Sequence, residues 1–113
     1  MFFTNFFSKT PTITTDKLAE LLAKKTPITV LDVRTPPEFH TAHLPNVRNY
    51  PLVQIDSYSN SKKNRIYLIS QSGKRSEEAT KILRNKGYKA INVKGGLDSW
   101  TGKLEHDLSL IHI

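Results

Sequence analysis

The stretch from Ile66 to Ser76 constrains the fold more than any other, because an apolar run stops there at a polar loop. The run Ile66–Ile69 is short and apolar, which predicts a buried strand. Two serines and a glycine then predict a tight turn, and a helical pattern begins just after the basic pair that follows. A strand, a loop and a helix N-terminus bring unpaired backbone N–H groups and the positive end of the helix dipole into one concavity. The stretch therefore predicts an anion-binding loop.

The rest of the chain alternates strand and helix patterns in the same way. The β-branched run Ile28–Val33 follows a proline and predicts a strand that is covered on both faces. Before it, Leu18, Leu21 and Leu22 have the spacing of an amphipathic helix. Further strands are expected at Thr10–Ile13, Val47–Tyr50 and Ala90–Val93, a short helix after Thr35, and a helix that ends at Gly87. This alternation predicts right-handed crossovers and a parallel sheet in a single α/β domain.

Composition excludes several classes of function. The chain has 113 residues, of which 37% are hydrophobic and 24% are charged, as in one ordinary globular domain. It contains no cysteine, which excludes a disulfide, a thiolate metal site and a cysteine nucleophile. We expect no metal and no cofactor. No run approaches the roughly 18 apolar residues of a membrane span, and Met1–Phe7 lacks the features of a secretory signal, so we expect a cytoplasmic protein.

The chain is strongly basic, with a net charge of +7 and many of its lysines and arginines beyond position 61. Such a face attracts anions and is compatible with nucleic acid. Because no aromatic residues are interleaved through it, we interpret it as a solvated face and do not expect nucleic-acid binding. A module that binds a partner or RNA through this face, or a partner through the aromatic N-terminus, remains an alternative.

Four motifs, in order along the chain, resemble the rhodanese-like domain family. The segment Leu31–Phe39 resembles its D-V-R-x-x-x-E-F signature, and Ala42–Val47 resembles its G-H-I-P-G-A turn. Ser70–Ser76 resembles its active-site loop C-x-S-G-x-R-S, and Gly95–Trp100 resembles its closing motif G-G-x-x-x-W. The resemblance implies a three-layer α/β/α sandwich around a five-stranded, mostly parallel sheet over residues 10–103. Residues 1–9 then form an N-terminal aromatic extension, and residues 104–113 form a C-terminal tail.

The length of the loop refines the resemblance. Ser70 to Arg75 is six residues, as in the sulfurtransferase branch, whereas the related phosphatases have one residue more. The resemblance therefore implies a loop that suits sulfate or thiosulfate, and it disfavours a phosphatase. It places Ser70 at the position of the catalytic cysteine and implies that the anion-binding loop consists of Gln71, Ser72, Gly73, Lys74, Arg75 and Ser76.

The chain departs from the family at the catalytic position itself. Sulfurtransferases of this family take a sulfane sulfur onto a cysteine thiolate, whereas a serine hydroxyl is far less acidic and forms no persulfide. We therefore predict that Ser70 does not transfer sulfur, while the loop still binds a small anion such as sulfate or thiosulfate. Whether the serine is natural or replaces a cysteine stays open. In the second case the parent protein is an active single-domain sulfurtransferase.

Two charged residues at the end of the second strand are expected to support the loop. We expect Asp32 to position Arg75 or the loop amides, and Arg34 either to attract anions or to pair with Glu38. No histidine is placed beside Ser70 by its spacing, which disfavours a serine esterase. We expect a monomer whose candidate partner is a protein sulfur carrier or another protein.

Overall fold

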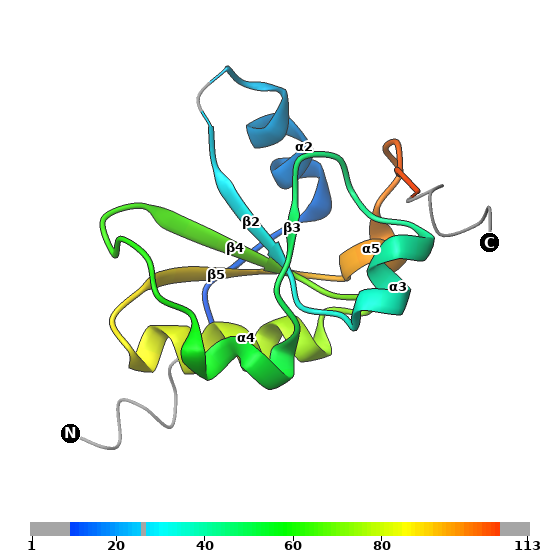
Figure 1. The fold of residues 1–113 in the computed structure, drawn as a ribbon. Helices are drawn as coiled ribbons and strands as arrows, with labels where there is room; N and C mark the ends of the chain where they lie inside the picture. The colour runs from blue at the N-terminus through cyan, green and yellow to red at the C-terminus, as the bar shows by residue number, and fades with distance from the viewer. Residues whose placement is uncertain (1–9, 26, 107–113) are drawn as a thin grey trace.

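The computed structural model describes residues 10–25 and 27–106, which form one five-stranded sheet (Figure 1). The strands lie in the order β1-β5-β4-β2-β3, and each neighbouring pair is parallel. Their bounds are β1 Thr12–Ile13, β2 Thr29–Asp32, β3 Arg48–Asn49, β4 Arg65–Ile69 and β5 Lys89–Val93. The predicted α/β fold with a parallel five-stranded sheet is confirmed.

Helices cover both faces of this sheet (Figure 1). The helix α4 and the 3-10 helix η1 pack against one face, where Leu31, Leu68 and Ala90 meet Ala79 and Leu83 of α4. The other face carries a second core around α2, α5 and the turn after α3. The bounds are α2 Thr15–Ala23, α3 Pro36–Thr41, η1 Leu52–Ser57, α4 Lys74–Asn85 and α5 Gly96–Ser99.

Local signals explain where most of these helices begin and end. The side chain of Thr14 accepts a hydrogen bond from the N–H of Lys17 and caps α2. Thr35 and Glu38 form a reciprocal capping box at the start of α3, as their spacing predicts. Gly87 follows α4 with a φ of 96°, which suits a glycine stop. The helix η1 was not predicted, because its six residues show neither a cap nor a clear helical stripe.

The order of the strands creates a switch point between β2 and β4. From β2 the chain continues outward to β3, and from β4 it continues in the opposite direction to β5. The two crossovers leave the sheet on different faces, which opens a space at the carboxyl ends of the two strands. Asp32 ends β2, and Ser70 follows β4 directly, so both lie at this position.

The two terminal segments fall largely outside the described residues. The predicted N-terminal extension lies outside them, as does most of the predicted tail. Of the tail, Glu105 forms an antiparallel bridge with His43 after α3. In the described ranges, no helix combines the length and the apolar character needed to cross a membrane.

A close backbone approach joins α5 to the loop after β4. The N–H groups of Leu97 and Asp98 donate to the carbonyls of Ser70 and Gln71 at 3.0 and 2.9 Å. Gly96 lies directly against the same carbonyls, with a φ of 55°. A Cβ on Gly96 would lie 2.0 Å from the Ser70 oxygen, so this approach requires glycine.

We expect Gly96→Ala to destabilise the domain by about 2–4 kcal/mol, because it combines a backbone clash with a left-handed φ. Gly87→Ala is the matched control. Its φ is also positive, at 96°, but its Cβ would meet only the flexible side chain of Lys62 at 3.6 Å. This control is expected to cost about 1–2 kcal/mol. Urea denaturation of the two variants checks the difference, and equal losses would contradict the close approach.

Candidate functional site

The hydroxyl of Ser70 lies at the centre of the loop after β4 and is completely buried. Its Oγ accepts hydrogen bonds from the backbone N–H groups of Gly73 at 3.2 Å and Ser76 at 3.1 Å. It also lies 3.0 Å from the Oγ of Ser76. The loop therefore folds around the side chain of Ser70.

The two hydrogen bonds from backbone N–H groups fix the direction of a buried hydrogen-bond chain. Because the Ser70 oxygen already accepts two N–H groups, its own proton goes to the Oγ of Ser76. Ser76 in turn donates its proton to the Oδ1 of Asn92 on β5 at 2.6 Å. Ser70 and Ser76 are fully buried, and Asn92 is 6% exposed. The hydrogen-bond chain thus runs from the hydroxyl of Ser70 through that of Ser76 to the side chain of Asn92.

This arrangement leaves the Ser70 hydroxyl without the partner that a nucleophile needs. Its proton is held by another hydroxyl, which is a poor base, and both of its acceptor positions are used. Nδ1 of His43 and Nδ1 of His106 instead bond the carbonyls of Phe39 and Thr41, and neither ring contacts Ser70 within the described residues.

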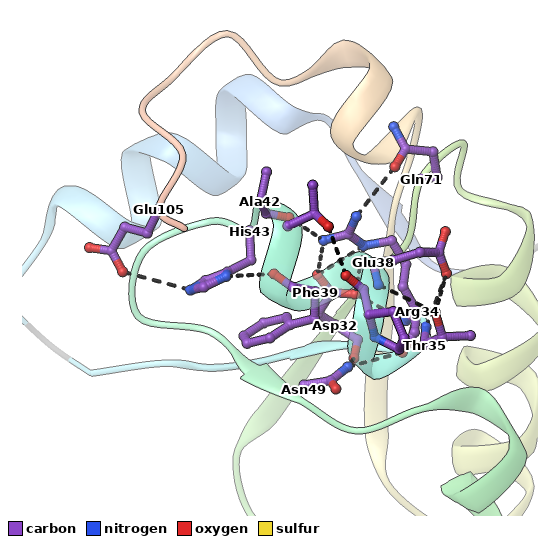
Figure 2. A network of polar contacts seen from close by, with 12 residues as sticks. Asp32, Arg34, Thr35, Glu38, Phe39, Ala42, His43, Asn49, Gln71 and Glu105 are labelled. Atoms are coloured by element: carbon purple, nitrogen blue, oxygen red, sulfur yellow. Dashed lines mark hydrogen bonds and ion pairs between the residues drawn. The ribbon is translucent and has the colours of Figure 1, made fainter. Parts of the chain in front are cut away.

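Asp32 and Arg34 form a buried ion pair with each other. The Nε and Nη2 of Arg34 donate to the carboxylate of Asp32 at 3.0 and 2.9 Å, and neither side chain is more than 4% exposed. Figure 2 shows the guanidinium of Arg34 also turned toward the Ala42 carbonyl, to which it donates at 2.7 Å. Of the alternatives expected for these residues, a direct contact of Asp32 with Arg75 and a pairing of Arg34 with Glu38 are not found, because Asp32 pairs with Arg34 and Glu38 pairs with Arg75. The reason is that Arg34 folds back onto the residue two positions before it.

Gln71 links this ion pair to α5. Its Oε1 accepts from the Nη1 of Arg34 at 3.4 Å, and its Nε2 donates to the Oδ1 of Asp98 at 2.7 Å. On the other side, the Nδ2 of Asn49 donates to the carbonyls of Asp32 and Arg34, both at 3.0 Å, and so holds the bend after β2 (Figure 2). Asn49 and Asp98 were missed in the sequence, since such contacts depend on which strand lies next to which.

Arg75 is paired with Glu38 across the loop. Its two terminal nitrogens donate to the two carboxylate oxygens at 2.7 and 3.0 Å, so the pair is bidentate. The hydrogen bonds from Arg75, assisted by those from Thr35, lower the pKa of Glu38 from 4.5 to about 2 despite its desolvation. The pKa of Arg75 is raised, mainly by its bond to Glu38. The two arginines beside the loop, Arg34 and Arg75, are therefore neutralised by carboxylates.

His43 lies in the turn after α3, as its motif predicts. Its Nδ1 donates to the Phe39 carbonyl at 2.7 Å, and its ring stacks on that of Phe39 at a centroid distance of 3.9 Å (Figure 2). Its Nε2 lies 3.8 Å from Glu105. These contacts give His43 a structural role in this turn.

The loop separates two surface hollows. The front hollow, of about 360 Å³, is lined by Arg34, Glu38 and Gln71 together with Thr41, Ala42, Leu97 and Leu104. The rear groove, of about 630 Å³, lies on the β1 side of the loop. Ser72, Gly73 and Lys74 border the rear groove rather than the front hollow. The predicted loop residues are thus divided between its two sides.

The backbone N–H groups of the loop are likewise divided. Those of Gly73 and Ser76 point to the Oγ of Ser70. Those of Gln71, Ser72, Lys74 and Arg75 have no acceptor within residues 10–25 and 27–106. In the same ranges, no cluster of three or more metal-ligating side chains is present. The structure therefore offers donors for an anion.

Asn92 is a site residue that sequence reasoning missed. A signal was present, because asparagine is depleted in strands and Asn92 interrupts the apolar run Ala90–Val93. Its role is visible only once β5 is known to lie beside β4.

The Glu38–Arg75 pair predicts a specific acid sensitivity. Because the pKa of Glu38 is lower in the folded state, its stabilisation is present above about pH 4.5 and is lost as the pH falls toward 2. Glu38→Gln removes the charge but keeps an oxygen for the capping box. We expect urea denaturation to show a difference of up to about 1 kcal/mol between wild type and variant at pH 7, since the pair is partly exposed. This difference should shrink at pH 3, and a difference that is constant with pH would contradict the assignment.

Comparison with known proteins supports the same family as the motifs. The family model described as "Rhodanese-like domain" matches residues 14–103. The chain is 35% identical over 101 residues to "Putative sulfur carrier protein YrkF" of Bacillus subtilis, covering 87% of this chain and 55% of the relative. It is 28% identical over 102 residues to "Sulfurtransferase" of Allochromatium vinosum, covering 88% of this chain and 92% of that protein. The chain thus spans only about half the length of YrkF.

Solved structures show the same fold. The crystal structure of a rhodanese-like domain protein from Staphylococcus aureus superposes with a TM-score of 0.79 and 32% identity. The superposition covers 85% of this chain and 97% of that one. Strand order, loop geometry and family match agree, and the chain belongs to the rhodanese-like domain family, with Ser70 at the position where the family motif has its cysteine.

Proposed function

We propose that this chain is a rhodanese-like domain that does not transfer sulfur and that retains an anion-binding loop. The observation that carries the proposal is the hydroxyl of Ser70, which is buried and has three hydrogen bonds. Relatives that are named sulfurtransferases and a sulfur carrier support a place in sulfur metabolism. The name of the sulfur carrier relative also supports a protein partner for this chain.

The environment of Ser70 still suits an anion at position 70. Two backbone N–H groups converge on the side chain, and α4 begins four residues later with its positive dipole end toward the loop. Such donors would stabilise a thiolate and lower the pKa of a thiol. For a hydroxyl, whose pKa is far higher, the same donors provide only ordinary hydrogen bonds. The change from sulfur to oxygen at position 70 therefore prevents sulfur transfer but leaves the loop folded.

A small anion such as sulfate or thiosulfate would bind the front hollow, using the backbone N–H of Gln71, which lines this hollow and has no acceptor among the described residues. This binding is expected to be weak, because the two nearby arginines, Arg34 and Arg75, are each neutralised by a carboxylate. Release of Arg75 from Glu38 would add a free guanidinium beside the loop. The carboxylate of Glu38 thus competes with the anion for the guanidinium of Arg75.

A thiosulfate–cyanide assay tests the sulfur-transfer part of the proposal. We expect wild type to show background activity and Ser70→Cys to gain activity, since the thiolate can attack the sulfane sulfur, release sulfite and pass the sulfur to cyanide. Ser72→Cys, with a thiol two residues away in the same loop, is the matched control and should stay inactive.

Wild-type turnover comparable with that of Ser70→Cys would overturn the proposal. An inactive but folded Ser70→Cys would show that the loss of the thiol alone does not explain why wild type lacks sulfurtransferase activity. In that case the enzyme alternative, a parent sulfurtransferase whose cysteine was replaced, also fails.

A sulfate titration tests the anion part. Glu38→Gln is expected to raise sulfate affinity about two- to fivefold, because it frees Arg75. Arg75→Ala should lower the affinity below that of wild type. Chemical shifts of Gln71 and Leu97 in nuclear magnetic resonance spectra report the front hollow. Sulfate affinities that are the same in all three proteins would contradict the role given to this pair.

A further inference from the structure

The rear groove has a charge pattern that the front hollow lacks. Three lysines, Lys74, Lys81 and Lys94, line it together with a single carboxylate, Glu77. None of the three lysines forms an ion pair with a residue of the described ranges. Because the carboxylate is outnumbered, the groove carries a net positive charge that no described group neutralises.

Asn92 presents an unpaired donor to this groove. It lines the groove, although its side chain belongs to a residue that is only 6% exposed. In the hydrogen-bond chain from Ser70 through Ser76, the hydroxyl of Ser76 donates to the Oδ1 of Asn92 and so keeps this oxygen turned inward. The Nδ2 is therefore the end left for the groove, and it has no acceptor among the described residues. An amide donor that faces the groove without a protein partner is available to an acceptor from outside the chain.

The start of α4 adds further donors. This helix is 12 residues long, and its cap, Gly73, provides no side-chain hydrogen bond. The N–H of Lys74 in its first turn lacks an acceptor in the described part of the chain. The positive end of the helix dipole thus lies at the edge of the groove, on the same side as the lysines.

We propose that the rear groove is a second anion site, which binds a small phosphate-bearing anion through Asn92, Lys81 and Lys94. A groove of about 630 Å³ with three cations suits an anion with more than one charge and more than one phosphoryl group. The inference goes beyond the anion bound at the front hollow, because it uses different side chains on the other side of the loop.

The two sides of the loop are connected through Asn92. An anion that accepts from the Nδ2 of Asn92 holds its Oδ1 toward Ser76, and Ser76 then accepts the proton of Ser70. An anion in the rear groove therefore stabilises the arrangement in which the hydroxyl of Ser70 donates its proton to the Oγ of Ser76. The groove acts on the loop without contact between the anion and Ser70.

Titration of the full chain with pyrophosphate, followed by nuclear magnetic resonance, tests this proposal. We expect saturable shifts of the Asn92 side-chain amide and of the backbone amides of Ser72, Lys81 and Lys94. Asn92→Asp keeps an oxygen for Ser76 but replaces the donor by a negative charge, so it should weaken binding by at least about tenfold. Asn60→Asp is the matched control with the same charge change, because Asn60 is exposed and its Oδ1 accepts from Ser61.

Two exposed positions keep the test valid if Asn92→Asp does not fold. Lys81→Ala and Lys94→Ala should each weaken pyrophosphate binding about two- to fivefold, whereas Lys63→Ala, which removes a lysine outside the groove, should not. Arg75→Ala should leave pyrophosphate binding unchanged, which separates this site from the front hollow. Shifts confined to Gln71 and Leu97, or equal affinities of wild type, Lys81→Ala and Lys94→Ala, would overturn the proposal.

Discussion

The hydrogen bonds to the side-chain oxygen of Ser70 are the interaction on which the loop depends. Two backbone N–H groups, from Gly73 and Ser76, turn inward to this single atom. A buried N–H without an acceptor costs about 1–3 kcal/mol, so the loop needs an acceptor at position 70 whether or not it performs chemistry. An oxygen meets this need as a sulfur would, which explains how the loop keeps its shape without the reaction.

Charge pairing then decides what the loop can bind. The two arginines beside it are each held by a carboxylate, Arg34 by Asp32 and Arg75 by Glu38. The first pair is buried and fixes the end of β2 against Gln71. The second pair is half-exposed and joins α3 to α4. The front of the loop is therefore nearly neutral, while the lysines of the rear groove keep their charge.

Local features were predictable from the sequence because they depend on residues close together in the chain. The capping box of Thr35 and Glu38, the tight turn at Gly73 and the strand before Ser70 are all of this kind. The family motifs added the strand number and the position of the loop. The ion-pair partners were not predictable in this way. Glu38 and Arg75 come from different helices, and the choice of Asp32 as the partner of Arg34 depends on how the chain bends after β2.

The Oγ of Ser70 accepts the N–H groups of Gly73 and Ser76 in a buried loop. Amide hydrogen exchange of wild type and Ser70→Ala measures this directly. We expect these two amides to be protected in wild type, while those of Ser72 and Lys74 exchange quickly. In Ser70→Ala, protection should fall at Gly73 and Ser76, whereas core amides such as that of Leu68 keep theirs. Unchanged protection of Gly73 and Ser76 in a folded Ser70→Ala would contradict the role of the Ser70 Oγ as their acceptor.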